Sequence, residues 1–161
     1  MLTARRGLAT AIDYAAMAAP LGLLAALTAL RYRRRPLPQP SATKVRVLVA
    51  VGLTMPLSAV LAATEAAGGS PGKRAMGLTL RDDTNAEPPS YSQALTRSLL
   101  KTALPWELGH QAVWEFRADN TRRGTVLAAG AYLALGLQAA AIVRGRRTYP
   151  DHVARTRVTS A

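Results

Sequence analysis

The feature that most constrains this chain is an apolar segment near its N-terminus. Leu8–Leu30 is a run of 23 residues with one charged side chain, Asp13. At about 1.5 Å of helical rise per residue, this length spans the roughly 30 Å hydrocarbon core of a bilayer. A carboxylate inside such a helix costs on the order of 2.5 to 3.5 kcal/mol unless it meets a partner or water. The segment therefore predicts a transmembrane helix over 8–30 whose Asp13 has a polar partner.

Arg6 lies just before this helix and shares a face with the acid. It precedes Asp13 by seven residues, which is about two helical turns. Arg5 and Arg6 before an apolar run also suggest a secretory or twin-arginine signal. The carboxylate inside the apolar region and the lack of a cleavage site argue against a signal. We therefore expect a retained helix that carries two charged groups on one side.

Two further segments are long and apolar enough to span a membrane. The uncharged run Val47–Thr64 lies in a helix expected over 45–66, and the uncharged run Gly124–Val143 lies in one expected over 122–143. With the first helix they predict an all-α integral membrane protein, built as a bundle of three transmembrane helices. The 161 residues leave room for one membrane domain.

The segment 91–116 is helical in pattern but too charged for a span that faces lipid. Ser90 and Gln93 form a capping box at its start, and Pro105 divides it into two pieces. Because it carries charges such as Lys101, it fits an interfacial or re-entrant hairpin, or a fourth span shielded by the other helices. The number of crossings, three or four, stays open.

Glu107 and His110 are the candidate polar pair of this segment. At positions i and i+3 they share a helix face, as carboxylate metal sites require. Such sites need a second matching pair, which the sequence lacks. We therefore expect no metal here and interpret the two residues as a polar pair at the membrane interface.

A loop over 67–90 and a basic tail over 144–161 complete the chain. The loop opens with a glycine-rich stretch that ends in Gly-Lys, but a phosphate-binding loop needs glycine at Ala67 and Ser or Thr at Arg74. Nucleotide binding is therefore not expected. Apolar residues alternate with others over 76–81, which predicts a short strand along the membrane surface.

Composition narrows the classes of partner and chemistry. The chain has 21 Lys and Arg and a net charge of +12, but only 5% aromatic residues and no basic helix interleaved with aromatics. Anionic lipid head groups therefore explain the charge better than nucleic acid does. With no cysteine there is no disulfide, thiolate zinc site or thiol nucleophile. We expect no cofactor and no enzyme activity, and as partners the bilayer and a second copy or another membrane protein.

Four features together resemble the RDD family of small bacterial membrane proteins, which is named for one arginine and two aspartates. They are Arg6, Asp13, the stretch 69–74 and Asp151. The resemblance covers about residues 6–158 and implies a multi-pass protein of the bacterial cell membrane. The family-motif residues that it implies are the charged Arg6, Asp13 and Asp151 and the loop residues Gly69, Pro71, Gly72, Lys73 and Arg74.

Two functions follow as hypotheses. The resemblance implies ion or solute transport, as proposed for some members, and a reversibly protonated Asp13 would bind a proton or cation. The alternative is a non-catalytic scaffold or accessory subunit, whose charged residues only hold the helices in register. Arg6 and Asp151 can meet at one membrane face only if the number of crossings is even.

Overall fold

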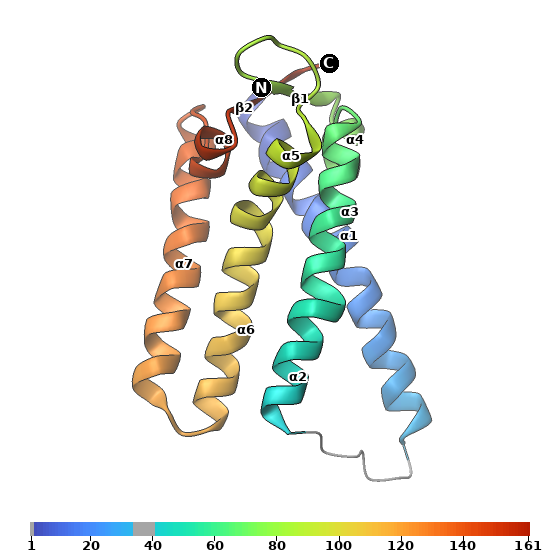
Figure 1. Ribbon diagram of the computed structural model, residues 1–161, viewed down its shortest axis with the longest axis vertical. Coiled ribbons are helices and arrows are strands. Elements are labelled where there is room, and N and C mark those ends of the chain that lie inside the picture. The colour runs from blue at the N-terminus through green and yellow to red at the C-terminus, as the bar shows by residue number, and fades with distance from the viewer. Residues whose placement is uncertain (1, 34–40) are drawn as a thin grey trace.

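Four helical columns lie side by side in the computed structural model, which describes residues 2–33 and 41–161 (Figure 1). The first is α1 and the last is α7, and each column between them is interrupted by a π-helical turn. Within the described residues, three helices are long and apolar enough to cross a membrane by length and composition: 2–31, 42–75 and 121–143. The columns are α1 (Leu2–Arg31); α2 (Ala42–Val49), η1 (Ala50–Thr54) and α3 (Met55–Ala66); α5 (Tyr91–Ser98), η2 (Leu99–Ala103) and α6 (Leu104–Arg117); and α7 (Thr121–Val143).

The third column contains the charged segment that was expected over 91–116. Residues 91–117 form one continuous helical column, with the π-helical turn η2 inside it, that runs antiparallel to α3 and α7 and along their length (Figure 1). The column lies alongside the other three, as the shielded span predicts, but among the described residues it is not one of the helices apolar enough to cross a membrane by composition. Both chain termini consequently lie at the same end of the bundle. The all-α membrane bundle predicted from the sequence is confirmed.

Wide turns precede the prolines of the two middle columns. The turn η1 ends just before Met55 and Pro56, and η2 ends just before Leu104 and Pro105. Proline lacks an N–H and crowds the carbonyl of the preceding turn, and a π-helical turn absorbs this conflict without ending the helix. Each column therefore stays continuous through its proline.

Side chains from three other elements bind the carbonyls that η2 leaves free. The Lys101 carbonyl accepts hydrogen bonds from Tyr14 Oη at 3.2 Å and from Gln138 Nε2 at 3.1 Å. The Leu100 carbonyl accepts one from Tyr149 Oη at 2.8 Å. Backbone groups freed by proline inside a membrane protein are usually satisfied by neighbouring helices in this way. Gln138, the one strongly polar residue in the uncharged part of α7 over 124–143, thus joins two columns.

Replacing Gln138 with leucine should therefore weaken the bundle modestly. Hydrogen bonds between membrane helices contribute about 0.6 kcal/mol on average and at most about 1.7 kcal/mol. We expect a loss in this range in the free energy of unfolding in detergent. Gln111→Leu is the control, because the Gln111 amide makes no hydrogen bond within the described ranges. Equal losses in the two variants would refute this role for Gln138.

A small cap closes the end of the bundle that holds the termini (Figure 1). It contains α4 (Pro71–Ala75), α8 (Tyr149–Val153) and an antiparallel pair of strands, β1 (Leu78–Asp82) and β2 (Thr156–Ser160). The expected strand over 76–81 is present, but it begins two residues later and ends one residue later. The segment 144–161, expected as a basic tail, instead folds into α8 and β2, because it pairs with β1 and covers the bundle end.

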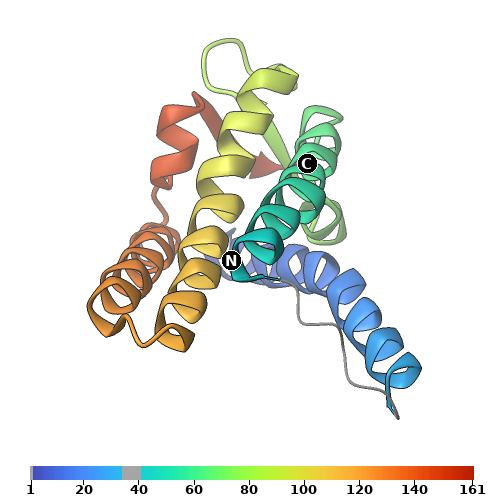
Figure 2. The same ribbon diagram turned by 60° about the horizontal axis from the view of Figure 1, so that its bottom comes forward.

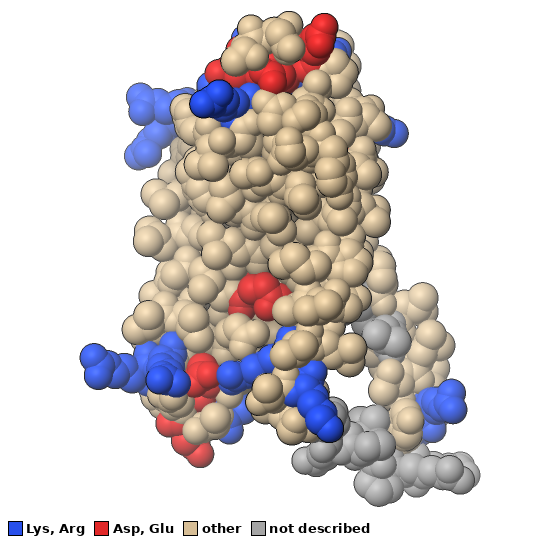
Figure 3. Space-filling view, viewed as in Figure 1, with Lys and Arg blue, Asp and Glu red and all other residues tan. Residues whose placement is uncertain are grey.

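The surface of the columns fits a lipid environment. Charged side chains gather at the two ends in the space-filling view, and the band between them is almost free of charge (Figure 3). Large apolar residues such as Val60, Tyr132 and Val143 are more than 60% exposed. The C-terminal half of α1 diverges from the other columns (Figure 2).

This arrangement predicts which surface positions share a side of the membrane. Single cysteines at Ser90 and Ser160 should react with an impermeant thiol reagent from the same side, and a cysteine at Ala118 from the opposite side. All three residues are exposed, and the native chain has no cysteine to interfere. Labelling of the first two positions from opposite sides would contradict a bundle of four crossings.

Candidate functional site

Seven charged side chains meet inside the capped end of the bundle, and none is more than 9% exposed. Four are cations and three are carboxylates. Six different elements supply them, so the cluster forms only when the columns and the cap assemble. The members are Arg6 and Asp13 from α1, Glu65 from α3, Lys73 from α4, Arg97 from α5, Lys101 from η2 and Asp151 from α8.

Asp13 is held by the start of α4. Its Oδ1 accepts a hydrogen bond from the Gly72 backbone N–H at 2.8 Å, and its Oδ2 accepts one from Ser70 Oγ at 2.6 Å. The Lys73 ammonium lies 3.9 Å from Oδ2. The expected partner of the intramembrane acid is therefore the glycine-rich loop. Gly72 permits this approach, because a Cβ there would lie 2.1 Å from the carbonyl oxygen of Ala9.

Glu65 joins α4 to α5 from the end of α3. Its Oε1 accepts hydrogen bonds from Lys73 Nζ and, at 2.6 Å, from Arg97 Nη1. The side chain is fully buried. Two cations on one carboxylate oxygen offset the cost of removing the acid from water.

Asp151 binds Arg97 through a different guanidinium nitrogen from the one that binds Glu65. Arg97 Nε donates to its Oδ1 at 2.6 Å, and Arg6 Nη2 lies 3.5 Å from its Oδ2. The backbone N–H and hydroxyl of Thr148 donate to Oδ2 in a capping box at the start of α8. Burial by itself raises the pKa of Asp151, but Arg97 and the Thr148 hydrogen bonds lower it more, so the pKa lies well below its usual range. This carboxylate therefore keeps its charge.

Six of the seven groups form one chain of alternating charge. In order it is Asp13, Lys73, Glu65, Arg97, Asp151 and Arg6, with each neighbouring pair in contact as an ion pair. Three carboxylates against three cations leave no net charge. Both ends of this six-charge chain lie on α1, so the sequence expectation that Arg6 and Asp151 meet agrees with the geometry.

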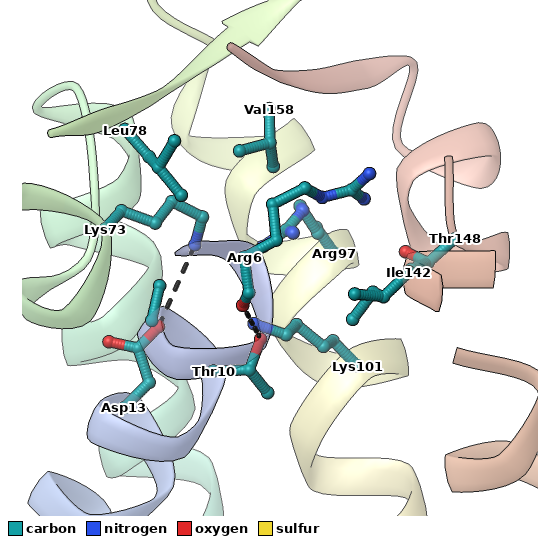
Figure 4. Close-up of a pocket in the computed structure, with 11 residues that line it drawn as sticks. Arg6, Thr10, Asp13, Lys73, Leu78, Arg97, Lys101, Ile142, Thr148 and Val158 are labelled. Carbon is teal, nitrogen blue, oxygen red and sulfur yellow. Dashed lines mark hydrogen bonds and ion pairs between the residues drawn. The ribbon is translucent and has the colours of Figure 1, made fainter. Parts of the chain in front are cut away.

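Lys101 is the seventh group and does not belong to that chain. Its side chain is 5% exposed, and its ammonium makes no hydrogen bond or ion pair within residues 2–33 and 41–161. It lines a cavity of about 20 Å³ beside Asp13 and Thr10 (Figure 4). The cavity is also lined by Arg6, Lys73 and Arg97 and by the apolar residues Ala9, Leu78, Ile142 and Val158.

A second, separate cavity lies further along the bundle. It measures about 160 Å³ and is mainly apolar, with the hydroxyl-bearing residues Tyr14, Thr54 and Thr102 in its wall. Tyr14 and Thr102 follow Asp13 and Lys101 directly in sequence. Thr54 Oγ1 donates a hydrogen bond to Glu107 Oε1. Polar groups thus recur from the charged cluster down to Glu107.

The structure separates the predicted polar pair. Glu107 binds Thr54, whereas His110 Nε2 accepts a hydrogen bond from Trp114 Nε1 at 3.1 Å. They have different partners because Glu107 faces η1, while the His110 ring stacks on Trp106 and meets the Trp114 ring edge-on. In the part of the chain that the structure describes, no three His, Cys, Asp or Glu residues are grouped to hold a metal ion.

The loop motif is only partly inside the site. Gly72 and Lys73 contact the charged cluster, and Pro71 begins α4. Arg74 is instead exposed and donates to the Ala67 carbonyl at 3.3 Å, and Gly69 contacts no charged carboxylate.

Sequence reasoning missed three members of the cluster: Glu65, Arg97 and Lys101. A signal was present, because Arg97 and Lys101 lie one turn apart on a helix that runs between apolar neighbours. Ionisable groups at membrane depth are costly and usually face the interior of a bundle. Treating the third column as a shielded span would have pointed both cations inward.

Comparison with known proteins gives one match. No curated protein and no solved structure matches the chain. The model of the RDD family matches residues 2–155 of the 161, which includes every member of the charged cluster. The match agrees with the resemblance carried by Arg6, Asp13, Asp151 and the stretch 69–74, and with the apolar helices of the bundle. The chain is an integral membrane protein that belongs to the RDD family.

Proposed function

We propose that this protein carries protons or small ions across the bacterial cell membrane, with Lys101 and Asp13 at the binding site. The observation that carries the proposal is the Lys101 ammonium, which is buried inside the bundle beside a cavity and has no partner within the described residues. An uncompensated charge in such a place is expensive and is typical of ion and proton pathways.

The charge balance of the cluster supports Lys101 as the group that gains and loses a proton during transport. The six-charge chain is neutral by itself, so a neutral Lys101 leaves the cluster balanced, and a protonated Lys101 adds one positive charge. Each other ionisable member has a counter-charge in contact. Proton exchange at Lys101 therefore costs least in broken ion pairs. Asp13 lines the same cavity, and its negative charge acts on the Lys101 ammonium.

Polar groups continue along the bundle beyond the charged cluster, which supports a transport function. Thr54 lines the second cavity and donates a hydrogen bond to Glu107, and an ion pair at 3.0 Å between Arg46 and Glu115 lies further along. Polar groups at successive depths of a bundle, with water between them, can pass a proton by short steps.

The test is proton movement in reconstituted vesicles. The purified protein is placed in liposomes with a pH-sensitive dye inside, and a potassium diffusion potential drives the flux. We expect uptake well above that of protein-free liposomes. Lys101→Met should reduce it to the protein-free rate, Asp13→Asn should slow it, and Lys44→Met, at an exposed lysine, should leave it unchanged.

Two results would contradict the proposal. If liposomes with the wild-type protein take up protons no faster than protein-free liposomes, the transport function is refuted. Equal proton fluxes for the wild type and Lys101→Met would show that this lysine is not part of the proton pathway.

The rival function is that of a scaffold or accessory subunit. The observation in its favour is the six-charge chain, because paired charges from α1, α3, α4, α5 and α8 hold these elements in one register without any chemistry. This function predicts a stable complex with another membrane protein in mild detergent and no flux in vesicles. The vesicle assay therefore separates the two functions.

A further inference from the structure

The cavity beside Lys101 offers more hydrogen-bond donors than acceptors. The Lys101 ammonium is unpartnered within the described residues, and so is Nη2 of Arg97, whose other two nitrogens bind Asp151 and Glu65. Glu65 Oε2 is a buried acceptor without a partner among the described residues, but Glu65 does not line the cavity. Both Asp13 oxygens accept hydrogen bonds, and the Thr10 hydroxyl donates to the Arg6 carbonyl. An occupant of this cavity must therefore accept hydrogen bonds.

The charge of the wall indicates the sign of the occupant. Four cations and one carboxylate line the cavity, and the two other carboxylates of the cluster are each held by two cations. With Lys101 protonated the cluster carries one net positive charge in a water-poor interior. One bound anion restores neutrality, and a buried charge requires such a partner.

The size of the cavity limits that anion. A volume of about 20 Å³ is enough for one water-sized particle, for which roughly 10–15 Å³ is the minimum. A single small monatomic anion is the largest charged occupant compatible with this space, whereas a carboxylate or a phosphate is too large.

We infer that the cavity binds one monovalent anion of about chloride size against Lys101, and that the anion enters and leaves together with a proton on this lysine. The inference deepens the proposed transport function and rests on it for the coupling of anion and proton. The titratable groups that face Lys101 are Arg6, Asp13 and Tyr14 from α1, Glu65 from α3, Lys73 from α4, Arg97 from α5, and Tyr149 and Asp151 from α8. Only Lys101 among these charged groups lacks a counter-charge.

The test separates binding from transport. Chloride binding to the purified protein is measured by titration calorimetry in gluconate buffer, because gluconate is too large for the cavity. We expect one chloride per chain for the wild type and for Lys44→Met. Lys101→Met should weaken binding at least about tenfold, since it removes a charged hydrogen bond. Lys101→Gln is a second neutral variant, and circular dichroism checks that both variants fold.

The vesicle assay supplies the second arm, driven by an inward gradient of chloride or of gluconate instead of a potassium diffusion potential, because an anion and a proton that move together carry no net charge. Chloride should increase proton uptake by the wild type several-fold. Chloride binding without proton flux would support the anion site and refute the transport function. Proton flux that is equal in chloride and gluconate, without chloride binding, would overturn the inference and leave the transport function standing. Chloride binding of equal strength in the wild type and both Lys101 variants would also overturn it.

Discussion

Replacing Arg97 with methionine is expected to lower the free energy of unfolding by about 3–5 kcal/mol, measured in detergent by denaturant titration. Arg97 is 2% exposed and binds two carboxylates, Glu65 and Asp151, with 2.6 Å hydrogen bonds. Methionine has a similar length, so it fills most of the space but leaves two buried acids short of a cation. The cost arises from those acids more than from the lost bonds themselves.

Arg122→Met is the matched control for this prediction. Arg122 is exposed on the first turn of α7 and makes no ion pair within the described ranges. Surface substitutions of this kind usually change stability by less than about 0.5 kcal/mol. If both arginine variants cost the same, the buried cluster would not be a centre of stability.

Replacing Gly72 with alanine is expected to be at least as damaging as typical overpacking, which costs about 1–3 kcal/mol and occasionally more. The added Cβ would lie 2.1 Å from the Ala9 carbonyl oxygen and 2.9 Å from Asp13 Oδ1. The nearest atom belongs to the backbone, so no side-chain rotation relieves the overlap. We expect α4 to move away from α1 and the Gly72 N–H bond to Asp13 to be lost.

Gly136→Ala controls for the general effect of a methyl group on a helical glycine. A Cβ at Gly136 meets no atom within 4 Å, and alanine there should be neutral or should stabilise α7 by up to about 1 kcal/mol. Thermal unfolding of the two variants gives the comparison. A Gly72→Ala protein as stable as Gly136→Ala would contradict the close packing of α4 on α1.

Hydropathy and charge patterns predicted the membrane fold well. Apolar runs of about 20 residues have few alternatives to a spanning helix, because an unpaired backbone is so costly in lipid. The capping box at Ser90 also specified where the third column begins, and it is present in the structure. Local signals of this kind depend on neighbours in sequence and need no knowledge of the fold.

The partners of the charged residues could be predicted only in part. The sequence predicts that Asp13 has a polar partner. It does not predict that the Gly72 backbone is that partner, because this depends on how α4 folds back onto α1. Similarly, the placement of Lys101 follows from the shielded position of the third column. Its charge excess became visible only after the other six charges were paired in space. Long-range pairing of this kind leaves no periodic trace in one sequence.

The central claim is that Lys101 is the one charge of the cluster without a partner among the residues that the structure describes, and two lysine variants test it most directly. The free energy of unfolding is compared for Lys101→Met and Lys73→Met in chloride-free buffer. Lys73 binds Glu65, Ser70 and Asp13, so its loss should cost about 3–5 kcal/mol. Lys101→Met should cost nothing or stabilise the protein, because it removes a buried charge without breaking an ion pair. A loss at Lys101 as large as that at Lys73 would contradict the account.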